Sequence, residues 1–513
     1  MNNRDIAAEV SVDTTPLFAY DRNIFGQFIE HFHRGIYGGV VDPGSSLSDE
    51  NGFRRDVKEA LRQLRTPVVR WPGGSFASGY HWKDGIGPER TATFDRVWRS
   101  VEPNTFGTDE FLRWTADIGS EAYICTNAGT GTLDEMSEWV EYCNAKGGTR
   151  WADRRASNGS PQAHDVRYWS VGNENYERWE LGAEDPVAWA RRVTEAAKIM
   201  RRVDPSIKLL AASNGDPSWA LPMLQSAGQY LDYISVHRYW DQLADINEPL
   251  GYEECMAHTL QPERTMDQLI ALLQVAGANH ISIAFDEWNL RGWHHPEGNS
   301  LEALAARDLN DDNSTYTMAD AVFTAAFLNA CIRHGDRVKM ANFAPAVNMR
   351  GPLYVHEHGL VKRTTYHVFG MYTSLLESHT LPTTARSQTL ETGDENVPVI
   401  DVVATGDPKS GNLSIVLINK SACKDSTVQL RMDGSLINAA ASVSTLGAHS
   451  PDAYNDVHHP ETVQPRESTV KVLGGLVTLP PHSISVFRVE GAPNIPSNLD
   501  WTIGTHRHIQ RSL

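Results

Sequence analysis

The chain has 513 residues, which is too long for one ordinary compact domain and sufficient for two. Hydrophobic residues make up 41% and charged residues 21% of the sequence, the balance of a globular protein with a large core. The formal net charge of -18 argues against nucleic acid or an anionic membrane as the main partner, because both need a basic surface, and against a strongly anionic substrate.

Eight short runs rich in Val, Ile, Tyr and Phe predict β-strands. In chain order they are "IFGQFIE" (24–30), "PVVRWPGGS" (67–75), "EAYICTNAG" (121–129), "VRYWSVGNE" (166–174), "IKLLAASNG" (207–215), "LDYISVHRY" (231–239), "ISIAFDEWN" (281–289) and "VKMANFAPAVN" (338–348). Segments with apolar residues at helical spacing lie between them, among them 53–64, 132–143, 186–200 and 317–332. In the third of these segments, Asp185 is the predicted N-cap and Pro186 occupies the first helical position.

Strands that alternate with crossover helices predict a parallel sheet, because parallel neighbours cannot be joined by a tight hairpin. Eight strands close a (β/α)8 TIM barrel, so the predicted fold class is α/β with such a barrel. A doubly wound open sheet is the competing arrangement.

From about residue 396 the pattern changes to short alternating runs separated by Gly, Pro, Asn, Asp and Ser. This pattern predicts an antiparallel, jelly-roll-like β-sandwich. The run "IAAEVSV" (6–12) also alternates and is predicted to add a strand to that sandwich. We therefore expect an N-terminal strand segment in residues 1–18, the barrel in 19–376 and the sandwich domain in 377–513, with 377–396 as a polar connector.

Polar residues stand at the predicted carboxyl ends of the barrel strands, where the active sites of such barrels lie. In strand order they are Glu30; Arg70 with Gly73, Gly74 and Ser75; Asn127; Asn173 and Glu174; Asn214; His237 and Tyr239; Asp286 and Glu287; and Asn348. Glu174 and Glu287, after the fourth and on the seventh strand, are predicted to face each other across the barrel mouth. Such a pair fits cleavage of a glycosidic bond, in which one carboxyl protonates the leaving oxygen and the other stays ionised.

A single Asn-Glu or Asp-Glu pair is more often a helix cap or an ion-pair partner. Here both pairs follow apolar strands and both are accompanied by aromatic residues, which favours the catalytic interpretation. Trp169 and Trp288 are expected in the core, whereas Trp98 and Trp293 lie in predicted loops and are candidates to pack on a sugar.

Three other classes of function are possible interpretations of the sequence: a metal hydrolase, a serine hydrolase and a carbohydrate-binding protein. The His clusters at 31–33, 294–295, 356–358 and 458–459 suggest a metal hydrolase, but none has the helical two-His spacing of a zinc protease. The segment "GGSFASG" approximates a serine-hydrolase elbow, yet Ala77 stands where that motif requires Gly. A carbohydrate-binding protein on the same fold is the non-enzymatic alternative, and the presence of both Glu174 and Glu287 favours an enzyme.

The segments "FGQFIEHFHRGIYGGV", "VRWPGGSFASGYHWKDGIGP", "NTFGTDEF", "WVEYCN", "WSVGNEN" and "FDEWN" resemble glycoside hydrolase family 51, the α-L-arabinofuranosidases. The resemblance runs from about residue 20 to 375 and is weaker in the sandwich. It implies a retaining double-displacement mechanism on a (β/α)8 barrel that releases terminal α-L-arabinofuranosyl residues from arabinose-containing oligo- or polysaccharides. It also implies that no metal and no organic cofactor is needed, and that the chain forms a homo-oligomer, as bacterial members often form hexamers.

The resemblance also implies roles for individual residues. Glu174 would be the acid/base and Glu287 the nucleophile. The substrate-binding residues would be Asn173 at the sugar 2-hydroxyl, Glu30 deep in the pocket, Arg70 and Tyr239 beside the nucleophile, His237 near the acid/base, Trp98 on the sugar, and Ser75 and Trp293 at the rim.

Three positions depart from the family pattern. Many members have Asn or Cys at Ser75, an aromatic residue at Arg291 and a polar or bulky residue at Gly351. We expect these positions on the sugar-binding rim, where they leave the sugar, the linkage and exo or endo action open. A galactofuranosidase and an endo-β-1,4-glucanase on the same scaffold are the alternatives.

The five cysteines are scattered and lack metal or redox spacing; they are Cys125, Cys143, Cys255, Cys331 and Cys423. We predict buried thiols in a reducing, cytoplasmic environment. The N-terminal stretch "MNNRDIAAEVSVDTT" has no apolar core of signal-peptide length, and no run of eighteen apolar residues predicts a membrane span.

Overall fold

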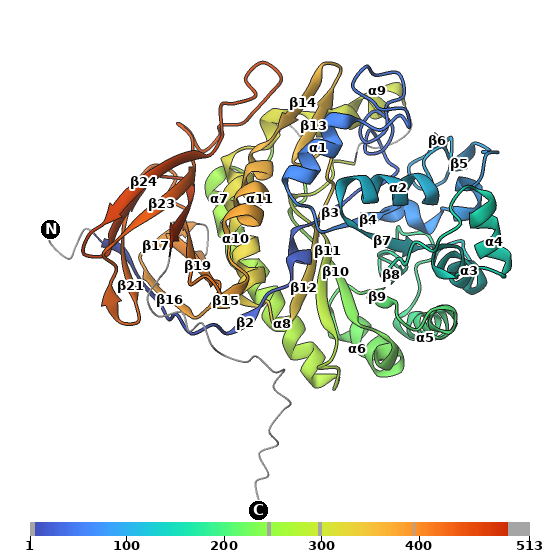
Figure 1. The fold of residues 1–513 in the computed structure, drawn as a ribbon, viewed down its shortest axis with the longest axis horizontal. Coiled ribbons are helices and arrows are strands. Elements are labelled where there is room, and N and C mark those ends of the chain that lie inside the picture. The colour runs from blue at the N-terminus through green and yellow to red at the C-terminus, as the bar shows by residue number, and fades with distance from the viewer. Residues whose placement is uncertain (1–5, 244–247, 296–299, 393–394, 491–513) are drawn as a thin grey trace, which may run out of the picture.

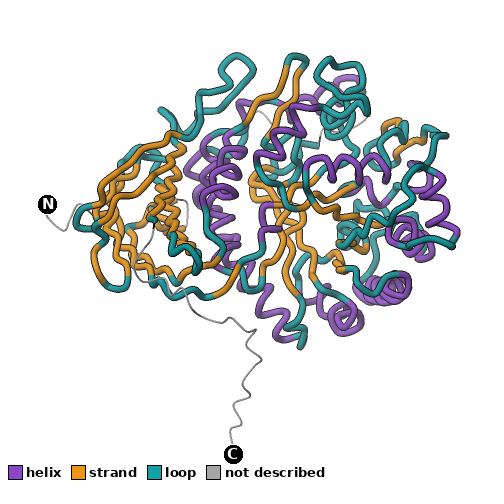
Figure 2. The backbone as a smooth tube through the Cα atoms, viewed as in Figure 1, coloured by secondary structure: helices purple, strands orange, loops and turns teal. Residues whose placement is uncertain are grey.

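The computed structural model describes residues 6–243, 248–295, 300–392 and 395–490. Figure 1 shows a barrel surrounded by helices beside a second unit built from β-sheets, with α10 and α11 between the two. Figure 2 shows that strands dominate the second unit, whereas helices line the outside of the barrel. No helix in the described part of the chain is long and apolar enough to cross a membrane.

Eight parallel strands form a closed barrel, in the order β10-β11-β12-β3-β4-β7-β8-β9. Their bounds are β3 Gly26–Phe28, β4 Val68–Trp71, β7 Glu121–Thr126, β8 Tyr168–Val171, β9 Lys208–Ala212, β10 Tyr233–Asp241, β11 Ser282–Arg291 and β12 Val338–Phe343. Each predicted run therefore supplies one barrel strand. The barrel is confirmed, and the open doubly wound sheet is excluded because β9 pairs with β10 and β12 pairs with β3.

Helices cover the outside of the barrel and include the four predicted ones. The α-helices are α1 Arg55–Gln63, α2 Thr108–Ile118, α3 Leu133–Asn144, α4 Arg150–Ser157, α5 Pro186–Val203, α6 Pro217–Ala227, α7 Tyr252–Ala257, α8 Gln261–Val275, α9 Leu301–Ala306, α10 Met318–Arg333 and α11 Thr364–Leu375. The predicted cap of α5 is present, because the Asp185 side chain accepts hydrogen bonds from the N–H groups of Val187 and Ala188. Short 3-10 helices connect other elements, with bounds η2 Arg22–Phe25, η3 Ser75–Ser78, η4 Trp82–Gly85, η5 Gly228–Tyr230, η6 His258–Leu260, η7 Arg307–Asp311 and η8 Asn313–Thr315.

A cluster of buried side chains, one from each of seven barrel strands, fills part of the barrel interior. They are Val68, Tyr123, Tyr168, Leu210, Tyr233, Ala284 and Met340, all buried. A second, larger cluster lies between the barrel and its helices and includes Trp169 and Trp288, as the sequence predicted for these two residues. The filled interior makes the barrel a packed support for the residues at its mouth rather than a channel.

The second unit is a sandwich of two sheets. One sheet contains β16 Thr383–Ser387, β1 Ile6–Val12, β21 Ser426–Met432, β22 Ser435–Leu436 and β25 Leu476–Leu479. The other has the order β2 Phe18–Ala19, β15 His379–Leu381, β19 Ile400–Gly406, β20 Leu413–Asn419, β26 Ser483–Val489, β23 Ala439–Leu446 and β24 Arg466–Val472. A separate apolar cluster, with Val10, Leu417 and Val428 among its members, fills the space between the sheets.

The N-terminal strand β1 joins this sandwich, as predicted. The sandwich was predicted to be antiparallel, but one of the two pairings of β1 is parallel. β1 pairs antiparallel with β16 and parallel with β21, so it lies inside its sheet. The prediction of a polar connector over 377–396 is wrong, because β15 and β16 are sheet strands. Exposed polar side chains on β16 hid this strand from the apolar pattern. The proposed domain boundaries stay a prediction.

Three two-stranded hairpins complete the described elements. They are β5 Thr93–Asp95 with β6 Ser100–Glu102, β13 Leu353–His356 with β14 Gly359–Lys362, and β17 Thr389–Thr392 with β18 Glu395–Pro398. Residues 491–513, the last part of the predicted sandwich domain, lie outside the described residues.

Candidate active site

Most of the predicted site residues meet at one end of the barrel, at or beyond the carboxyl ends of its strands. They are Glu30 after β3, Arg70 in β4, Asn173 and Glu174 after β8, His237 and Tyr239 in β10, and Glu287 in β11. Hydrogen bonds and ion pairs connect most of these residues with one another. The sequence prediction of one shared site at the barrel mouth therefore agrees with where these residues lie.

Glu287 is a buried carboxylate that is held ionised. The Tyr239 hydroxyl donates to Oε1 at 2.6 Å, and Arg70 Nη1–H donates to Oε2 at 2.9 Å. Burial raises the pKa of Glu287, but the charges of His237 and Arg70 and the Tyr239 hydrogen bond outweigh burial and lower it below its usual value. An ionised carboxylate is the state that a nucleophile requires.

Arg70 is fully buried and is held by a second carboxylate. Its Nε lies 3.4 Å from Asp286 Oδ2, and its Nη2–H donates to Asn173 Oδ1 at 2.7 Å. Asp286 also accepts from the hydroxyls of Tyr123 at 2.6 Å and Ser235 at 2.7 Å. Burial raises the pKa of Asp286, but the Arg70 charge and the accepted hydrogen bonds lower it to about 2. Asp286 therefore holds in place the cation that pairs with Glu287.

Asn173 leaves one donor group without a partner. Its Oδ1 accepts from Arg70, whereas its Nδ2 is buried and has no hydrogen-bond partner among the described residues. A buried N–H group without a partner is costly, so this donor suits a hydroxyl oxygen of a bound sugar.

Glu174 follows β8 on a sharp turn. Gly172 has a φ of +69°, and a Cβ there would lie 2.1 Å from Asn175 Oδ1, so this position requires glycine. Glu174 itself has a φ of 44°, a backbone conformation that is uncommon for a residue with a side chain. The turn directs Glu174 toward β10, where its Oε1 lies 2.8 Å from His237 Nδ1.

His237 lies between the two glutamates. Its Nδ1 is 2.8 Å from Glu174 Oε1 and 3.4 Å from Glu287 Oε2. Burial lowers the pKa of His237, but the Glu287 charge and hydrogen bonds to Asp286 and Glu174 raise it to about 10. A protonated imidazole therefore connects the two carboxyl groups at neutral pH.

Glu174, His237 and Glu287 are also the one group of three potential metal ligands found among the described residues, with ligand atoms within 4.8 Å of one another. The nearby carboxylates raise the pKa of His237, so a metal ion at this position would have to displace a proton from the ring. The arrangement fits a charge-paired network better than a metal centre. His31 in the "HFH" cluster is used elsewhere, with Nδ1 3.0 Å from Glu102 Oε2.

Glu30 lies against the backbone that follows β4. A Cβ on Gly73 would lie 2.7 Å from Glu30 Cγ, so glycine is needed for this close approach. Trp98 Nε1–H donates to Glu30 Oε1 at 3.1 Å. Burial raises the pKa of Glu30 to about 8, and the charge of Glu287 adds to this. Glu30 is therefore mostly neutral at pH 7, when it can both donate to and accept from sugar hydroxyls.

Trp98 and Trp293 pack around Phe32. The ring centroids of Phe32 and Trp98 are 4.7 Å apart, and those of Phe32 and Trp293 are 4.9 Å apart. The three rings line a hollow of about 280 Å³. Trp98 reaches the site through its ring nitrogen, whereas Trp293 is joined to the site through this aromatic cluster and is mostly buried.

Two charged residues that the sequence did not indicate also belong to the site. Arg350 follows β12 and donates Nη2–H to the Tyr239 hydroxyl at 2.9 Å. Glu180, on the loop after β8, accepts from the Ser75 hydroxyl at 2.6 Å. Their position in loops after barrel strands was a signal, but the sequence does not say which polar residue of a loop turns inward.

Comparison with known proteins identifies the family to which the chain belongs. The model of the "Alpha-L-arabinofuranosidase 1 domain" matches residues 60–255, and that of the "Alpha-L-arabinofuranosidase C-terminal domain" matches residues 286–483. The "Probable alpha-L-arabinofuranosidase C" of Aspergillus niger is 34% identical over 497 residues, which are 91% of this chain and 94% of that protein. The solved structure of the "thermostable GH51 alpha-L-arabinofuranosidase" of Thermotoga petrophila superimposes with a TM-score of 0.85 at 34% identity, covering 94% of this chain and 100% of that one. The chain belongs to glycoside hydrolase family 51.

A bacterial relative of family 51 has a more specific name. The "Intracellular exo-alpha-(1->5)-L-arabinofuranosidase" of Halalkalibacterium halodurans is 32% identical over 430 residues, which are 80% of this chain and 84% of that protein. The predicted family and the glycoside hydrolase class are thus confirmed. The roles of the individual site residues stay predictions that the geometry supports.

Arg291 and Gly351, two of the three positions that depart from the family 51 pattern, do not lie as expected on the sugar-binding rim. Arg291 does not lie on the sugar-binding rim: it is 1% exposed, and it pairs with Asp241 at 2.7 Å and with Asp320 at 3.1 Å. Gly351 forms a tight turn in which a Cβ would lie 2.8 Å from Pro345 O. The adjacent Arg350 places a polar side chain after this strand, where it donates to the Tyr239 hydroxyl.

The cysteine prediction also needs a correction. Cys125, Cys143, Cys255 and Cys331 are buried free thiols, whereas Cys423 is exposed. Cys423 lies in the polar segment between β20 and β21.

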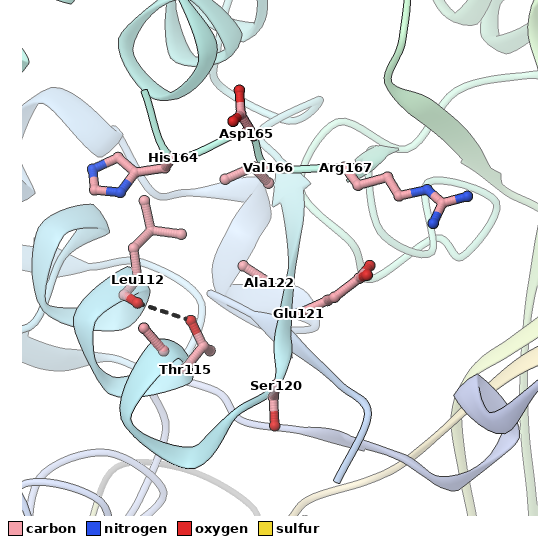
Figure 3. A pocket seen from close by; sticks show the side chains of 10 residues that line it. Leu112, Thr115, Ser120, Glu121, Ala122, His164, Asp165, Val166 and Arg167 are labelled. Atoms are coloured by element: carbon pink, nitrogen blue, oxygen red, sulfur yellow. Dashed lines mark hydrogen bonds between the residues drawn. The ribbon is translucent and has the colours of Figure 1, made fainter. Parts of the chain in front are cut away.

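A different pocket lies at the opposite end of the barrel, as shown in Figure 3. It has a volume of about 350 Å³ and is lined from α2, the start of β7 and the segment before β8. His164 and Arg167 extend to opposite sides of it. Because the amino ends of barrel strands rarely carry catalysis, this pocket does not compete with the site at the mouth.

Proposed function

We propose that the protein is a retaining α-L-arabinofuranosidase that releases terminal arabinofuranosyl residues from arabinose-containing oligo- or polysaccharides. The observation that carries the mechanism is a carboxylate oxygen of Glu174 within 4.8 Å of one of Glu287. Retaining glycosidases place their two carboxyl groups about 5 Å apart, whereas inverting enzymes leave about 6.5–9.5 Å for a water molecule. The names of the family 51 relatives support the arabinofuranosyl substrate.

In the first step the Glu287 carboxylate attacks the anomeric carbon. The bond from this carbon to the leaving oxygen breaks, and Glu174 gives that oxygen its proton. The product is an arabinofuranosyl ester of Glu287. Tyr239 and Arg70 hold the attacking carboxylate in one orientation, while Asn173 Nδ2–H is free to bind a sugar hydroxyl.

In the second step water attacks the anomeric carbon of the ester. Glu174, now ionised, takes a proton from this water, and Glu287 leaves as a carboxylate. Two displacements at the same carbon retain its configuration. His237 Nδ1 lies 2.8 Å from Glu174 Oε1 and 3.4 Å from Glu287 Oε2, so the ring can hold both carboxyl groups in place during this step.

A panel of aryl glycosides tests the substrate. It contains the α-L-arabinofuranoside, β-D-galactofuranoside, β-D-xyloside and β-D-glucoside, with a soluble β-glucan as a polymer. We expect turnover of the arabinofuranoside in clear preference to the others. Preference for another member would refute the proposed sugar while leaving the two glutamates in their roles.

Two variants test the roles of the glutamates. Glu287→Ala should lose activity on every substrate by several orders of magnitude, because no nucleophile remains. Glu174→Ala should form the glycosyl ester with little loss from substrates with good leaving groups, hydrolyse it slowly, and be rescued by azide. Equal losses on all substrates, without azide rescue, would contradict the acid/base role of Glu174.

We further propose that the protein is cytoplasmic and forms a homo-oligomer, a hexamer being the form that the family resemblance suggests. The support for a cytoplasmic location is the name of the Halalkalibacterium halodurans relative, which includes "intracellular". Light scattering of the purified protein measures the assembly, and a monomeric mass would refute this part of the proposal.

A further inference from the structure

Glu180 is a buried carboxyl group on the loop that also carries Glu174. It is 5% exposed, and its Oε2 accepts the Ser75 hydroxyl at 2.6 Å. Its Oε1 is buried and has no hydrogen-bond partner among the described residues. The proposed catalytic steps do not use this carboxyl, although it lies next to the residues that perform them.

We propose that Glu180 is a positioning residue that sets the direction of the Ser75 hydroxyl in the sugar pocket. The inference rests on the proposed function, because it concerns how the same site binds its sugar. Ser75 begins η3 directly after the glycines that contact Glu30, and the next N–H, that of Phe76, donates to Glu30 Oε1 at 2.9 Å. Ser75 is half-buried, and its side chain lies on the same short segment as the backbone that contacts Glu30.

A serine hydroxyl has one hydrogen to donate and two lone pairs that can accept. When Glu180 is ionised, it can only accept, so it takes the Ser75 hydrogen in a short, charge-assisted bond. Ser75 then offers only lone pairs to a sugar hydroxyl. When Glu180 is protonated, it can donate to Ser75 instead, and the direction of the Ser75 hydroxyl is no longer fixed.

Both states of Glu180 are accessible near neutral pH. Burial raises the pKa of Glu180 to about 7, the hydroxyls of Ser75 and Ser78 oppose this, and the neighbouring carboxyl groups add to it. The titratable and polar groups that act on this carboxyl are Ser75 and Ser78 on η3, Glu174 on its own loop, Glu287 on β11 and Cys125 on β7. No cation is among these groups, so the hydrogen bond from Ser75 is the main contact that favours the ionised form of Glu180.

The first test compares Glu180→Gln with the wild type in their pH dependence. The KM for an aryl α-L-arabinofuranoside and the inhibition constant of arabinose are measured between about pH 6 and 8, on both sides of the pKa of about 7. For the wild type we expect both constants to fall by about two- to tenfold as the pH rises. A change of this size corresponds to the contribution of one hydrogen bond between Ser75 and the sugar. Glu180→Gln cannot ionise, so both constants should lack this fall, and kcat should change less than KM.

Glu177→Gln is the matched control. Glu177 is a carboxyl on the same loop, it also faces Glu174, and it has no hydrogen bond to η3 among the described residues. Its substitution should leave the fall in KM in place. A profile that is the same in Glu180→Gln and the wild type, or lost in both variants, would overturn the inference.

Ser75→Ala provides an independent test with a small change in volume. It should remove the same pH-dependent fall, and Glu180→Gln should add nothing to it, because both act through one hydrogen bond. Additive effects of the two substitutions would refute the coupling. If the wild type prefers another glycoside, the proposed sugar fails, and the same series on that glycoside still decides the role of Glu180.

Discussion

The hydroxyl of Tyr239 makes the shortest hydrogen bond to the proposed nucleophile, and its removal gives a quantitative test of the site. In Tyr239→Phe the 2.6 Å bond to Glu287 Oε1 is lost while the ring stays. A hydrogen bond to a charged group contributes about 1.5–3 kcal/mol, and one pKa unit corresponds to about 1.4 kcal/mol. Because this bond favours the ionised carboxylate, its loss should raise the pKa of Glu287 by about one to two units.

The assay is the dependence of kcat/KM on pH with an aryl arabinofuranoside. Its acid limb reports protonation of the nucleophile in the free enzyme, since a protonated Glu287 cannot attack. The limb should move to higher pH by about one to two units in Tyr239→Phe. Arg70 and His237 remain in place and keep part of the lowering of the pKa.

Tyr123→Phe is the matched control, because it removes a bond of the same length, 2.6 Å, to the adjacent carboxylate of Asp286. Asp286 holds Arg70 and does not attack, so the acid limb should stay close to that of the wild type while the protein loses stability. An unmoved acid limb in Tyr239→Phe, or an equal movement in both variants, would refute the assignment of Tyr239 to the charge of Glu287.

Three other features give separate predictions. The pKa of Glu30 rises from 4.5 to about 8 on folding, so the folded state prefers the protonated form and loses stability as the pH rises between these values. The glutamine in Glu30→Gln does not titrate, so the melting temperature of this variant relative to the wild type should increase from pH 5 to about pH 8. A constant difference in melting temperature would contradict this prediction. Arg291→Met leaves Asp241 and Asp320 without their buried cation and should cost about 3–5 kcal/mol in urea unfolding with KM unchanged, whereas a residue on the sugar rim would change KM. A thiol reagent should modify Cys423 alone in the native protein and all five cysteines after unfolding, and rapid reaction of a second thiol in the native state would show that the core is open.

The barrel could be predicted from the sequence because its strands are buried on both faces. Such strands read as apolar runs, and the polar residues that end them stand out. Glu174 and Glu287 were found in this way, and the closed order of the eight strands brings them together. The strand β16 was missed because its exposed polar residues do not differ from those of a connector.

The directions of side chains were harder to predict than the positions of strands. Arg291 was expected at the rim because many family 51 members carry an aromatic residue at this place, yet its side chain bonds to the carboxylate of Asp320 on α10. Arg350 reaches over the Tyr239 ring, with its guanidinium carbon 4.6 Å from the ring centroid. The directions of these two side chains depend on Asp320 and Tyr239, which are distant from them in the sequence, so a local sequence pattern does not predict them.

The place of β1 inside its sheet has a consequence for the order in which the chain is made. Residues 6–12 leave the ribosome before the barrel strands, but their partners in β16 and β21 follow about 370 residues later or more. All eight barrel strands, which end at Phe343, emerge before the last of these partners at Met432. Because domains generally fold as they are synthesised, the barrel can close while β1 still lacks its partner strands β16 and β21. Formation of the sandwich then joins the two ends of the described chain around a barrel that is already formed.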